Sequence, residues 1–198
     1  LEARLFETLT GCQDHWAAVR GGVQAVHLVP GGNRLERLET DPRWIEPRFT
    51  VFFTGITHHS GMVNWQVIRR RLEGDPSTTH GLQEISEAAV SCRTAVLSGD
   101  TDAVGEALRR EWAARKHLAP EICPPELAHL ESEALTKGAL AFKACGAGGG
   151  GSVLIWHEPA AAGPVAKALV EAAPNGMLFP RGIALSGCMV RDTTSGSG

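Results

Sequence analysis

Residues 143–152 read Lys-Ala-Cys-Gly-Ala-Gly-Gly-Gly-Gly-Ser, and five of the six residues from 146 to 151 are glycine. Glycine loses more backbone entropy on folding than any other residue, so such a run is favourable only where φ is positive or another group approaches the backbone closely. Successive backbone N–H groups in such a loop can form a concave anion site. A flexible linker is the alternative. A Walker A loop is excluded, because no Gly-Lys-Ser/Thr follows.

The flanking segments favour a structured loop over a linker. Residues 140–144 and 153–156 are short apolar runs typical of buried strands. Further upstream, residues 22–38 predict a hairpin around a Pro-Gly-Gly-Asn turn. Residues 48–54 predict a half-buried strand with Phe49, Val51 and Phe53 on one face.

Helical spacing accounts for much of the remaining chain. The apolar residues of these expected helices are Leu82, Ile85, Ala89, Cys92 and Val96 before a cap at Gly99, then Val104, Leu108 and Trp112, then Leu127, Leu130 and Ala134 after Pro124-Pro125. Residues 1–9 and 164–173 also have helical character, and 183–185 resembles a strand. The expected class is α+β, with helices on one face of a mostly antiparallel sheet.

The 198 residues are enough for one domain and at most a second small unit. A net charge of −3 gives no electrostatic footprint for binding nucleic acid or an anionic membrane, so a small ligand is expected. The five cysteines form no C-x-x-C pair, which favours reduced thiols. No apolar run reaches the roughly 18 residues of a membrane span. These features together predict a cytoplasmic protein.

Two further segments carry candidate functional residues. Gln13 and Asp14 precede a helix of small, uncharged residues, where a desolvated carboxylate would be costly unless it is functional. An exposed aspartate that caps a short helix is the alternative. Residues 53–60 read Phe-Thr-Gly-Ile-Thr-His-His-Ser, a strand end leading into a helix. Neighbouring histidines rarely point at one ion and no acidic residue flanks them, so we expect no metal site at His58 and His59.

Together these motifs resemble the GHMP kinase superfamily, and most of all its heptose kinase branch, with fucokinase as the nearest relative. The motifs, in order, are G-x-Q-D before Gly-Gly and a hairpin, Phe-Thr-Gly-Ile, Glu111-Trp112 with Lys116-His117-Leu118, and the K-x-x-GAGGGG segment from Lys143. The resemblance covers about residues 1–190.

The resemblance implies two lobes that bind ATP, Mg²⁺ and a sugar or sugar phosphate between them. The family's main phosphate loop, a Pro-x-Gly-Leu-Gly-Ser-Ser-type segment, and an upstream Glu that helps to hold Mg²⁺ do not occur in this chain. We therefore expect an N-terminally incomplete chain that needs the missing lobe segment as a partner. Its expected divisions are residues 1–45 as a remnant of the N-terminal lobe, 46–190 as the C-terminal domain and 191–198 as a tail.

By the same resemblance, Asp14 corresponds to the catalytic aspartate. Gln13, Thr54, Gly55 and His58 are expected to contact the substrate. The residues expected to support the nucleotide phosphates are Gly146, Ala147, Gly148, Gly149, Gly150 and Gly151. Two departures bear on the substrate: His15-Trp16 stands where the family has Gln and an aromatic residue, and His58 stands where it has Arg. A lost cation weakens the prediction of a phosphorylated sugar.

The expected function is an ATP-dependent sugar kinase, with the isolated chain inactive. A non-catalytic sugar-binding or protein-interaction module of the same fold is the alternative.

Overall fold

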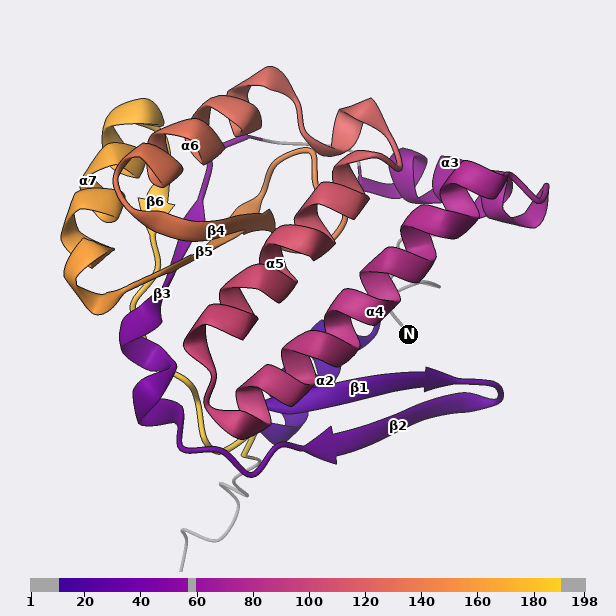
Figure 1. Ribbon diagram of the computed structural model, residues 1–198, viewed down its shortest axis with the longest axis horizontal. Coiled ribbons are helices and arrows are strands. Elements are labelled where there is room, and N and C mark those ends of the chain that lie inside the picture. Colours follow the sequence, from indigo (N-terminus) through magenta and orange to yellow (C-terminus); the bar gives the residue numbers. More distant parts are fainter. Residues whose placement is uncertain (1–10, 57–59, 190–198) are drawn as a thin grey trace, which may run out of the picture.

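A computed structural model describes residues 11–56 and 60–189, with the side chains of 60–62 left out. Its helices and strands are α2 (Gln13–Arg20), β1 (Gln24–Val29), β2 (Gly32–Arg37), β3 (Phe49–Phe53), α3 (Ser60–Leu72), α4 (Pro76–Ser98), α5 (Thr101–Lys116), α6 (Pro125–Thr136), β4 (Ala139–Ala144), β5 (Ser152–His157), α7 (Ala162–Ala172) and β6 (Met177–Leu178). Figure 1 shows their arrangement. The helix expected over 1–9 and the tail over 191–198 lie outside the described residues.

The central sheet has four strands in the order β4-β5-β3-β6, and each neighbouring pair is antiparallel. Lys143 on β4 pairs with Leu154 on β5. The glycine-rich segment connects these two neighbouring strands. Strands β1 and β2 form a separate hairpin. The expected α+β class with a mostly antiparallel sheet is confirmed.

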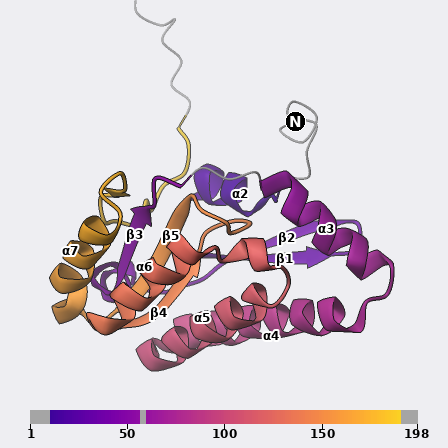
Figure 2. The same cartoon turned by 90° about the horizontal axis from the view of Figure 1, so that it is seen from above.

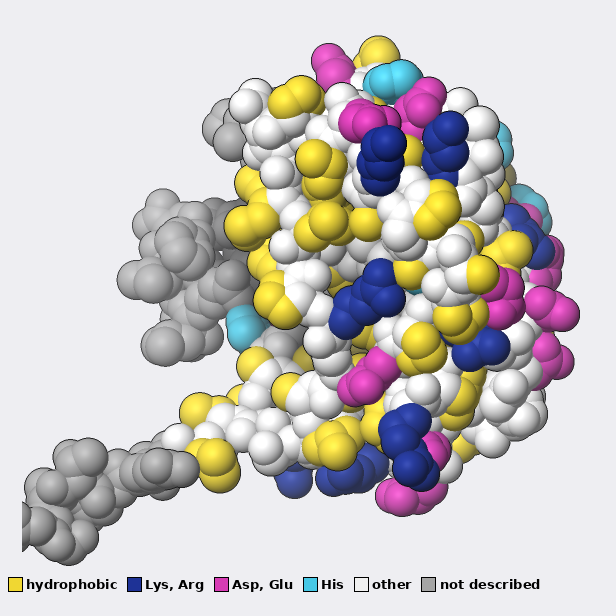
Figure 3. Space-filling model, turned by 90° about the vertical axis from the view of Figure 1, so that its left-hand side faces the viewer, with side chains coloured by type: hydrophobic (Ala, Val, Ile, Leu, Met, Phe, Trp, Pro, Cys, Tyr) yellow, Lys and Arg dark blue, Asp and Glu magenta, His cyan; other side chains and the backbone are white. Residues whose placement is uncertain are grey.

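Helices α6 and α7 cover one face of this sheet (Figure 2). Leu127 and Leu130 of α6 and Val165 and Leu169 of α7 are buried against Phe52 and other apolar residues of the strands. Burial of one large aliphatic side chain contributes about 1.5–3 kcal/mol, so these helices are held mainly by this layer. Around α7 and β6 several hydrophobic side chains also reach the surface (Figure 3), namely Val170, Met177, Leu178 and Phe179.

Helix α5 runs along the edge strand β4, and α4 packs on the outside of α5 (Figures 1 and 2). Asp75 and Asp100 cap the N-termini of α4 and α5 by accepting hydrogen bonds from Thr78 and Ala103. Gly99 ends α4 with a left-handed φ of 70°. The predicted cap at Gly99 and the two helices around it are therefore confirmed.

Several contacts attach the hairpin and α2 to the rest of the molecule. Glu36 of β2 accepts hydrogen bonds from Nε and Nη2 of Arg93 on α4, the first over 2.8 Å. The C-terminal segment returns to α2, where the N–H of Cys188 donates to the carbonyl of Ala18 over 2.9 Å. Trp44 and Ile45 pack with Trp156, so the expected division after residue 45 falls beside a shared apolar cluster.

The half-buried strand expected at 48–54 is confirmed with Phe49, Val51 and Phe53 on one face, whereas the strand expected at 183–185 is wrong. In β3 the fully buried residues are Phe52 and Thr50, whereas Phe49, Val51 and Phe53 on the other face are half-buried. Thr50 is accommodated in the interior because its hydroxyl bonds to Nε2 of His157 over 2.9 Å. Residues 183–185 form no strand, and β6 is instead the short partner of β3.

Candidate active site

The glycine-rich segment forms a tight loop between β4 and β5. The N–H of Cys145 donates to the carbonyl of Ser152 over 2.8 Å and closes the base of the loop. All five glycines have positive φ, from 69° at Gly151 to 152° at Gly150. L-residues with side chains rarely adopt this region, so the backbone shape explains the composition.

Two neighbouring segments hold the loop in place. The N–H of Gly149 donates to the carbonyl of Ile122 over 2.8 Å, and the N–H of Gly151 donates to the carbonyl of Ile56 over 3.1 Å. A Cβ at Gly148 would lie 2.7 Å from Cγ2 of Ile122, so close approach as well as φ requires glycine. These contacts define a structured loop rather than a linker.

The other N–H groups of the loop donate to no backbone carbonyl within the described part of the chain. They are the N–H groups of Gly146, Ala147, Gly148 and Gly150. A buried backbone N–H without an acceptor is costly. The loop therefore has donors that an anion such as a phosphate would satisfy.

Thr54 supports the loop and is 3% exposed. Its N–H and its hydroxyl both donate to the carbonyl of Gly151 over 2.9 Å, and the hydroxyl accepts from the N–H of Ile56 over 3.2 Å. The neighbouring Gly55 has φ of 75°, and a Cβ there would lie 2.8 Å from the carbonyl oxygen of Asn175. The geometry gives Thr54 a contact with the loop, and its expected contact with a sugar stays a prediction.

Gln13 and Asp14 lie at the start of α2, and both are exposed. The expected desolvation of Asp14 is therefore wrong. The capping alternative is also wrong, because Cys12 occupies the cap position and Asp14 lies in the first turn. A carboxylate at this position is favoured by the helix dipole and remains accessible to a substrate.

Electrostatics places Asp14 near the glycine loop. Although Cys145 is exposed as a residue, desolvation by its surroundings raises the pKa of the thiol, and the negative charge of Asp14 raises it further. The positive charge of Lys143 acts in the opposite direction on the same pKa. The start of the loop thus lies within range of both charges.

A cavity of about 280 Å³ opens beside the loop. Gly11 before α2, Asn64 on α3, Arg115 on α5 and Ala147 of the loop all line it. Most of its remaining lining is apolar, from Val63 and other residues of α3, α4 and the segment after α5. Parts of the chain that are distant in sequence therefore meet at one opening.

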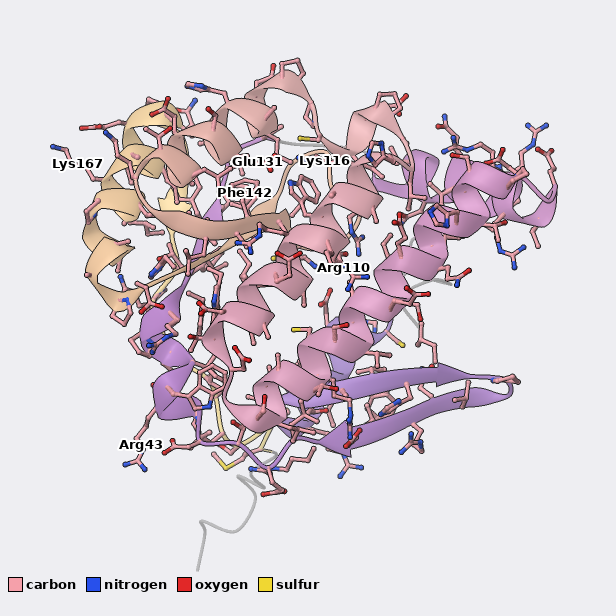
Figure 4. All side chains as sticks on the ribbon, in the orientation of Figure 1. Arg43, Arg110, Lys116, Glu131, Phe142 and Lys167 are labelled. Carbon is pink, nitrogen blue, oxygen red and sulfur yellow. The ribbon has the colours of Figure 1, made fainter. Side chains whose placement is uncertain are left out.

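No sequence motif assigned a role to the charged residues of α5, α6 and β4 that lie near the glycine loop. Lys116 at the end of α5 and Glu131 on α6 lie together (Figure 4), with Nζ 3.0 Å from both carboxylate oxygens. This ion pair links the end of α5 to α6, and the segment that contains Ile122 lies between these two helices. Glu111, Arg115 and Lys143 form a second cluster. In the sequence, Glu111 is recognisable as a charged residue next to Trp112, which belongs to an apolar helical stripe.

The structure does not place every predicted residue. His58 lies outside the described residues, as does His59. Within the described ranges, no group of three or more His, Cys, Asp or Glu side chains is arranged to hold a metal ion. No helix in the described part of the chain is long and apolar enough to cross a membrane.

Residues 92–175 match the protein family described as GHMP kinases C terminal. The chain is 24% identical over 163 residues to D-glycero-alpha-D-manno-heptose 7-phosphate kinase of Campylobacter jejuni, covering 80% of this chain and 48% of the enzyme. It is 30% identical over 163 residues to the bifunctional fucokinase/GDP-fucose pyrophosphorylase of Arabidopsis thaliana, covering 79% of this chain and 15% of that protein. The chain thus spans about half of the first relative and a small part of the second.

Solved structures share the fold. The crystal structure of L. major mevalonate kinase in complex with R-mevalonate superposes with a TM-score of 0.72 at 17% identity, over 89% of this chain and 53% of that one. Residues 92–175, which match the family, contain α5, α6, α7 and the glycine loop between β4 and β5. Residues 92–175 therefore form a GHMP kinase C-terminal domain, and the chain has the fold of that domain.

Proposed function

We propose that this chain is part of an ATP-dependent sugar kinase that phosphorylates a hydroxyl group of a heptose phosphate or a related sugar. The observation that carries the proposal is the glycine loop: several of its N–H groups have no backbone acceptor among the described residues, and its Ala147 lines the same cavity as Gly11, just before the Asp14 helix. The related heptose 7-phosphate kinase and fucokinase support the sugar as substrate.

The loop fits the phosphates of ATP on two grounds. Its positive φ angles and the absence of side chains at five of its six residues leave a loop made mainly of backbone, which is the group that binds phosphate oxygens in such loops. Several of its N–H groups have no acceptor among the described residues. ATP with Mg²⁺ supplies the phosphoryl group, and residues 146–151 would hold its oxygens through these donors.

Asp14 would act on the attacking hydroxyl group of the sugar. An exposed carboxylate in the first turn of α2 is able to accept the hydroxyl proton or to orient the hydroxyl. Phosphoryl transfer depends mainly on positioning and electrostatic stabilisation, so one carboxylate and an anion-binding loop are the principal requirements that this chain meets.

The remaining predicted residues would contact or position the sugar. Gln13 precedes Asp14 on the exposed start of α2 and would bind sugar hydroxyl groups. Gly55 would allow the backbone after β3 to approach the sugar, and Thr54 would keep this backbone against the loop. His58 would contact the part of the sugar that distinguishes phosphorylated from unphosphorylated substrates.

The test is an activity assay on the full gene product that contains residues 1–198. It is incubated with ATP and Mg²⁺ and with heptose 7-phosphate, heptose 1-phosphate, fucose or galactose, and the sugar product is identified by ³¹P NMR. We expect phosphorylation of at least one heptose phosphate or fucose. Absence of sugar-dependent ADP formation with all four would contradict the proposal. Sugar binding without turnover would support a non-catalytic module.

A further inference from the structure

We propose that Glu111 and Arg115 are positioning residues that fix the start of the glycine loop. Neither residue was assigned a role from the sequence motifs. The predicted effect on turnover rests on the proposed kinase function, whereas the predicted effect on the loop itself does not.

Arg115 bridges α5 and the loop. Its Nη1 donates to the carbonyl oxygen of Gly146 over 2.9 Å. Its Nε donates to Oε1 of Glu111 over 2.7 Å, and Nη2 donates to the same oxygen. A planar guanidinium with both of these contacts has one orientation, so Glu111 determines where Arg115 holds the loop.

Glu111 is held in turn by a second cation. Nζ of Lys143, the last charged residue before the loop, lies 3.2 Å from Oε2 of Glu111. The Glu111 side chain is 10% exposed, and Oε2 accepts no hydrogen bond within the described part of the chain. A buried carboxylate between two cations is strongly coupled to both, because removing one partner leaves a charge without compensation.

This support acts on a glycine whose Cβ direction faces open space. A Cβ built on Gly146 would meet no atom within 4 Å, whereas one on Gly148 or Gly150 would meet Ile122 or Ile56 at 2.7 Å. The far part of the loop is therefore held by close contacts and by the N–H groups of Gly149 and Gly151. At Gly146, with φ of 72°, the hydrogen bond from Arg115 is the restraint.

Helix α5 supplies its own matched control. Arg109 is paired with Glu106 through Nε and Nη2 over 3.1 and 2.7 Å, and its Nη1 donates to the carbonyl oxygen of Leu140 over 2.7 Å. It thus has the same two kinds of contact as Arg115. Its carbonyl partner, however, lies within strand β4 and not in the loop.

The experiment compares Arg115→Lys with Arg109→Lys in the full gene product. Lysine keeps the charge but is unable to bond to the carboxylate and the carbonyl in the same fixed geometry. We expect Arg115→Lys to lower kcat by about 10- to 100-fold with little change in the KM for the sugar, because a misplaced loop impairs transfer more than sugar binding. Arg109→Lys should leave both values within about threefold.

Amide hydrogen exchange provides a readout that does not depend on activity. In Arg115→Lys, peptides covering residues 144–151 should exchange about tenfold faster, while peptides from α6 and α7 remain unchanged. Glu111→Gln should have the same effect and Glu106→Gln none. Circular dichroism and melting temperature check that each variant remains folded, and Arg115→Lys carries the test if Glu111→Gln does not fold.

Each result decides the proposal. Equal exchange and equal kcat in Arg115→Lys and Arg109→Lys would overturn it and leave Glu111–Arg115 as an ordinary ion pair. Faster loop exchange with unchanged kcat would overturn the catalytic role. An inactive wild-type protein whose variants still differ in loop exchange would refute the kinase function while the restraint on the loop stands.

Discussion

The N–H of Gly149 donates to the carbonyl oxygen of Ile122 over 2.8 Å, which ties the glycine loop to the segment between α5 and α6. The ion pair of Lys116 and Glu131 links α5 and α6, the two helices that this segment connects. The position of the proposed phosphate-binding loop therefore depends on contacts with residues that would not touch the phosphate. The following predictions test the loop, the carboxylate on α2 and the attachment of the hairpin.

Gly148→Ala should abolish activity, whereas Gly74→Ala should not affect it. The two glycines have φ of 84° and 81°, but a Cβ at Gly148 would lie 2.7 Å from Ile122 and one at Gly74 would meet no atom within 4 Å. Gly74→Ala should lower the free energy of unfolding by about 1–2 kcal/mol. Gly148→Ala should lower it by roughly 1–3 kcal/mol more through overpacking. Urea denaturation and kcat measurements would show this contrast, and similar losses in both variants would contradict it.

Asp14→Asn should lower kcat by roughly 10²- to 10⁴-fold with little change in ATP affinity, since asparagine keeps the shape but removes the proton acceptor. Asp102→Asn is the matched control, because Asp102 is also an exposed aspartate in the first turn of a helix. Both variants should melt at similar temperatures. A kcat for Asp14→Asn within threefold of wild type would remove Asp14 from the mechanism.

Glu36 should make the stability of the chain depend on pH. Hydrogen bonds from Arg93 and then His27 lower the pKa of Glu36 from 4.5 to about 2. A carboxyl group with a depressed folded-state pKa contributes stability above its unfolded value, and this contribution is lost as the pH falls from about 4.5 toward 2.

Urea unfolding between pH 5.5 and 2.5 measures this effect. The difference between wild type and Glu36→Gln should be largest at pH 5.5 and shrink as the pH falls. Glu39 is exposed and lies three residues after Glu36 in the sequence, so Glu39→Gln is the control variant. Parallel stability curves for wild type and Glu36→Gln would show that the Arg93 contact does not attach the hairpin.

His58→Arg should tighten the binding of a sugar phosphate. The resembling family has Arg at this position, and a charge-assisted hydrogen bond contributes about 1.5–3 kcal/mol, or roughly 10- to 150-fold in affinity. Unphosphorylated sugars should bind as before. Calorimetric titration with a phosphorylated and an unphosphorylated heptose checks this, and an equal gain for both would refute the role of residue 58 in phosphate recognition.

The 198 residues alone should bind ATP no more tightly than about 1 mM, or roughly −4 kcal/mol. They contain one glycine loop and no Pro-x-Gly-Leu-Gly-Ser-Ser-type segment, so we expect them to form one wall of the nucleotide site. Calorimetry on the 198-residue chain with ATP and Mg²⁺ is the measurement. Micromolar binding would mean that residues 146–151 are themselves the main phosphate site.

Local sequence patterns predicted most of the secondary structure. The spacing of Leu82, Ile85 and Ala89 with Gly99 at the end was sufficient for α4, because side-chain periodicity and a left-handed cap are local properties. The glycine run likewise indicated positive φ before its surroundings were known. The candidate residues Asp14 and 146–151 were found in the same way, from motifs.

Other features depended on contacts between distant residues. Alternation in β3 predicted two faces, but the bond between Thr50 and His157 and the packing of Phe52 decided which face is buried. The two residues of β6 have too little local preference to predict a strand, and they are held by pairing with β3. Residues 183–185 have strand-like composition but lack such a partner in the described structure.

By itself, the sequence determined the helices at the apolar stripes between residues 82 and 134 and a glycine turn with positive φ between two strands, because these follow from steric and hydrophobic properties of neighbouring residues. Only the tertiary structure decided that Ile122 and Ile56 accept hydrogen bonds from the turn and that Arg115, oriented by Glu111, restrains Gly146. The contacts made by the turn join residues about 30 to 95 positions apart, whereas Glu111 and Arg115 are neighbours on α5. The geometry of these contacts arises when α5 packs along β4, which no local pattern specifies.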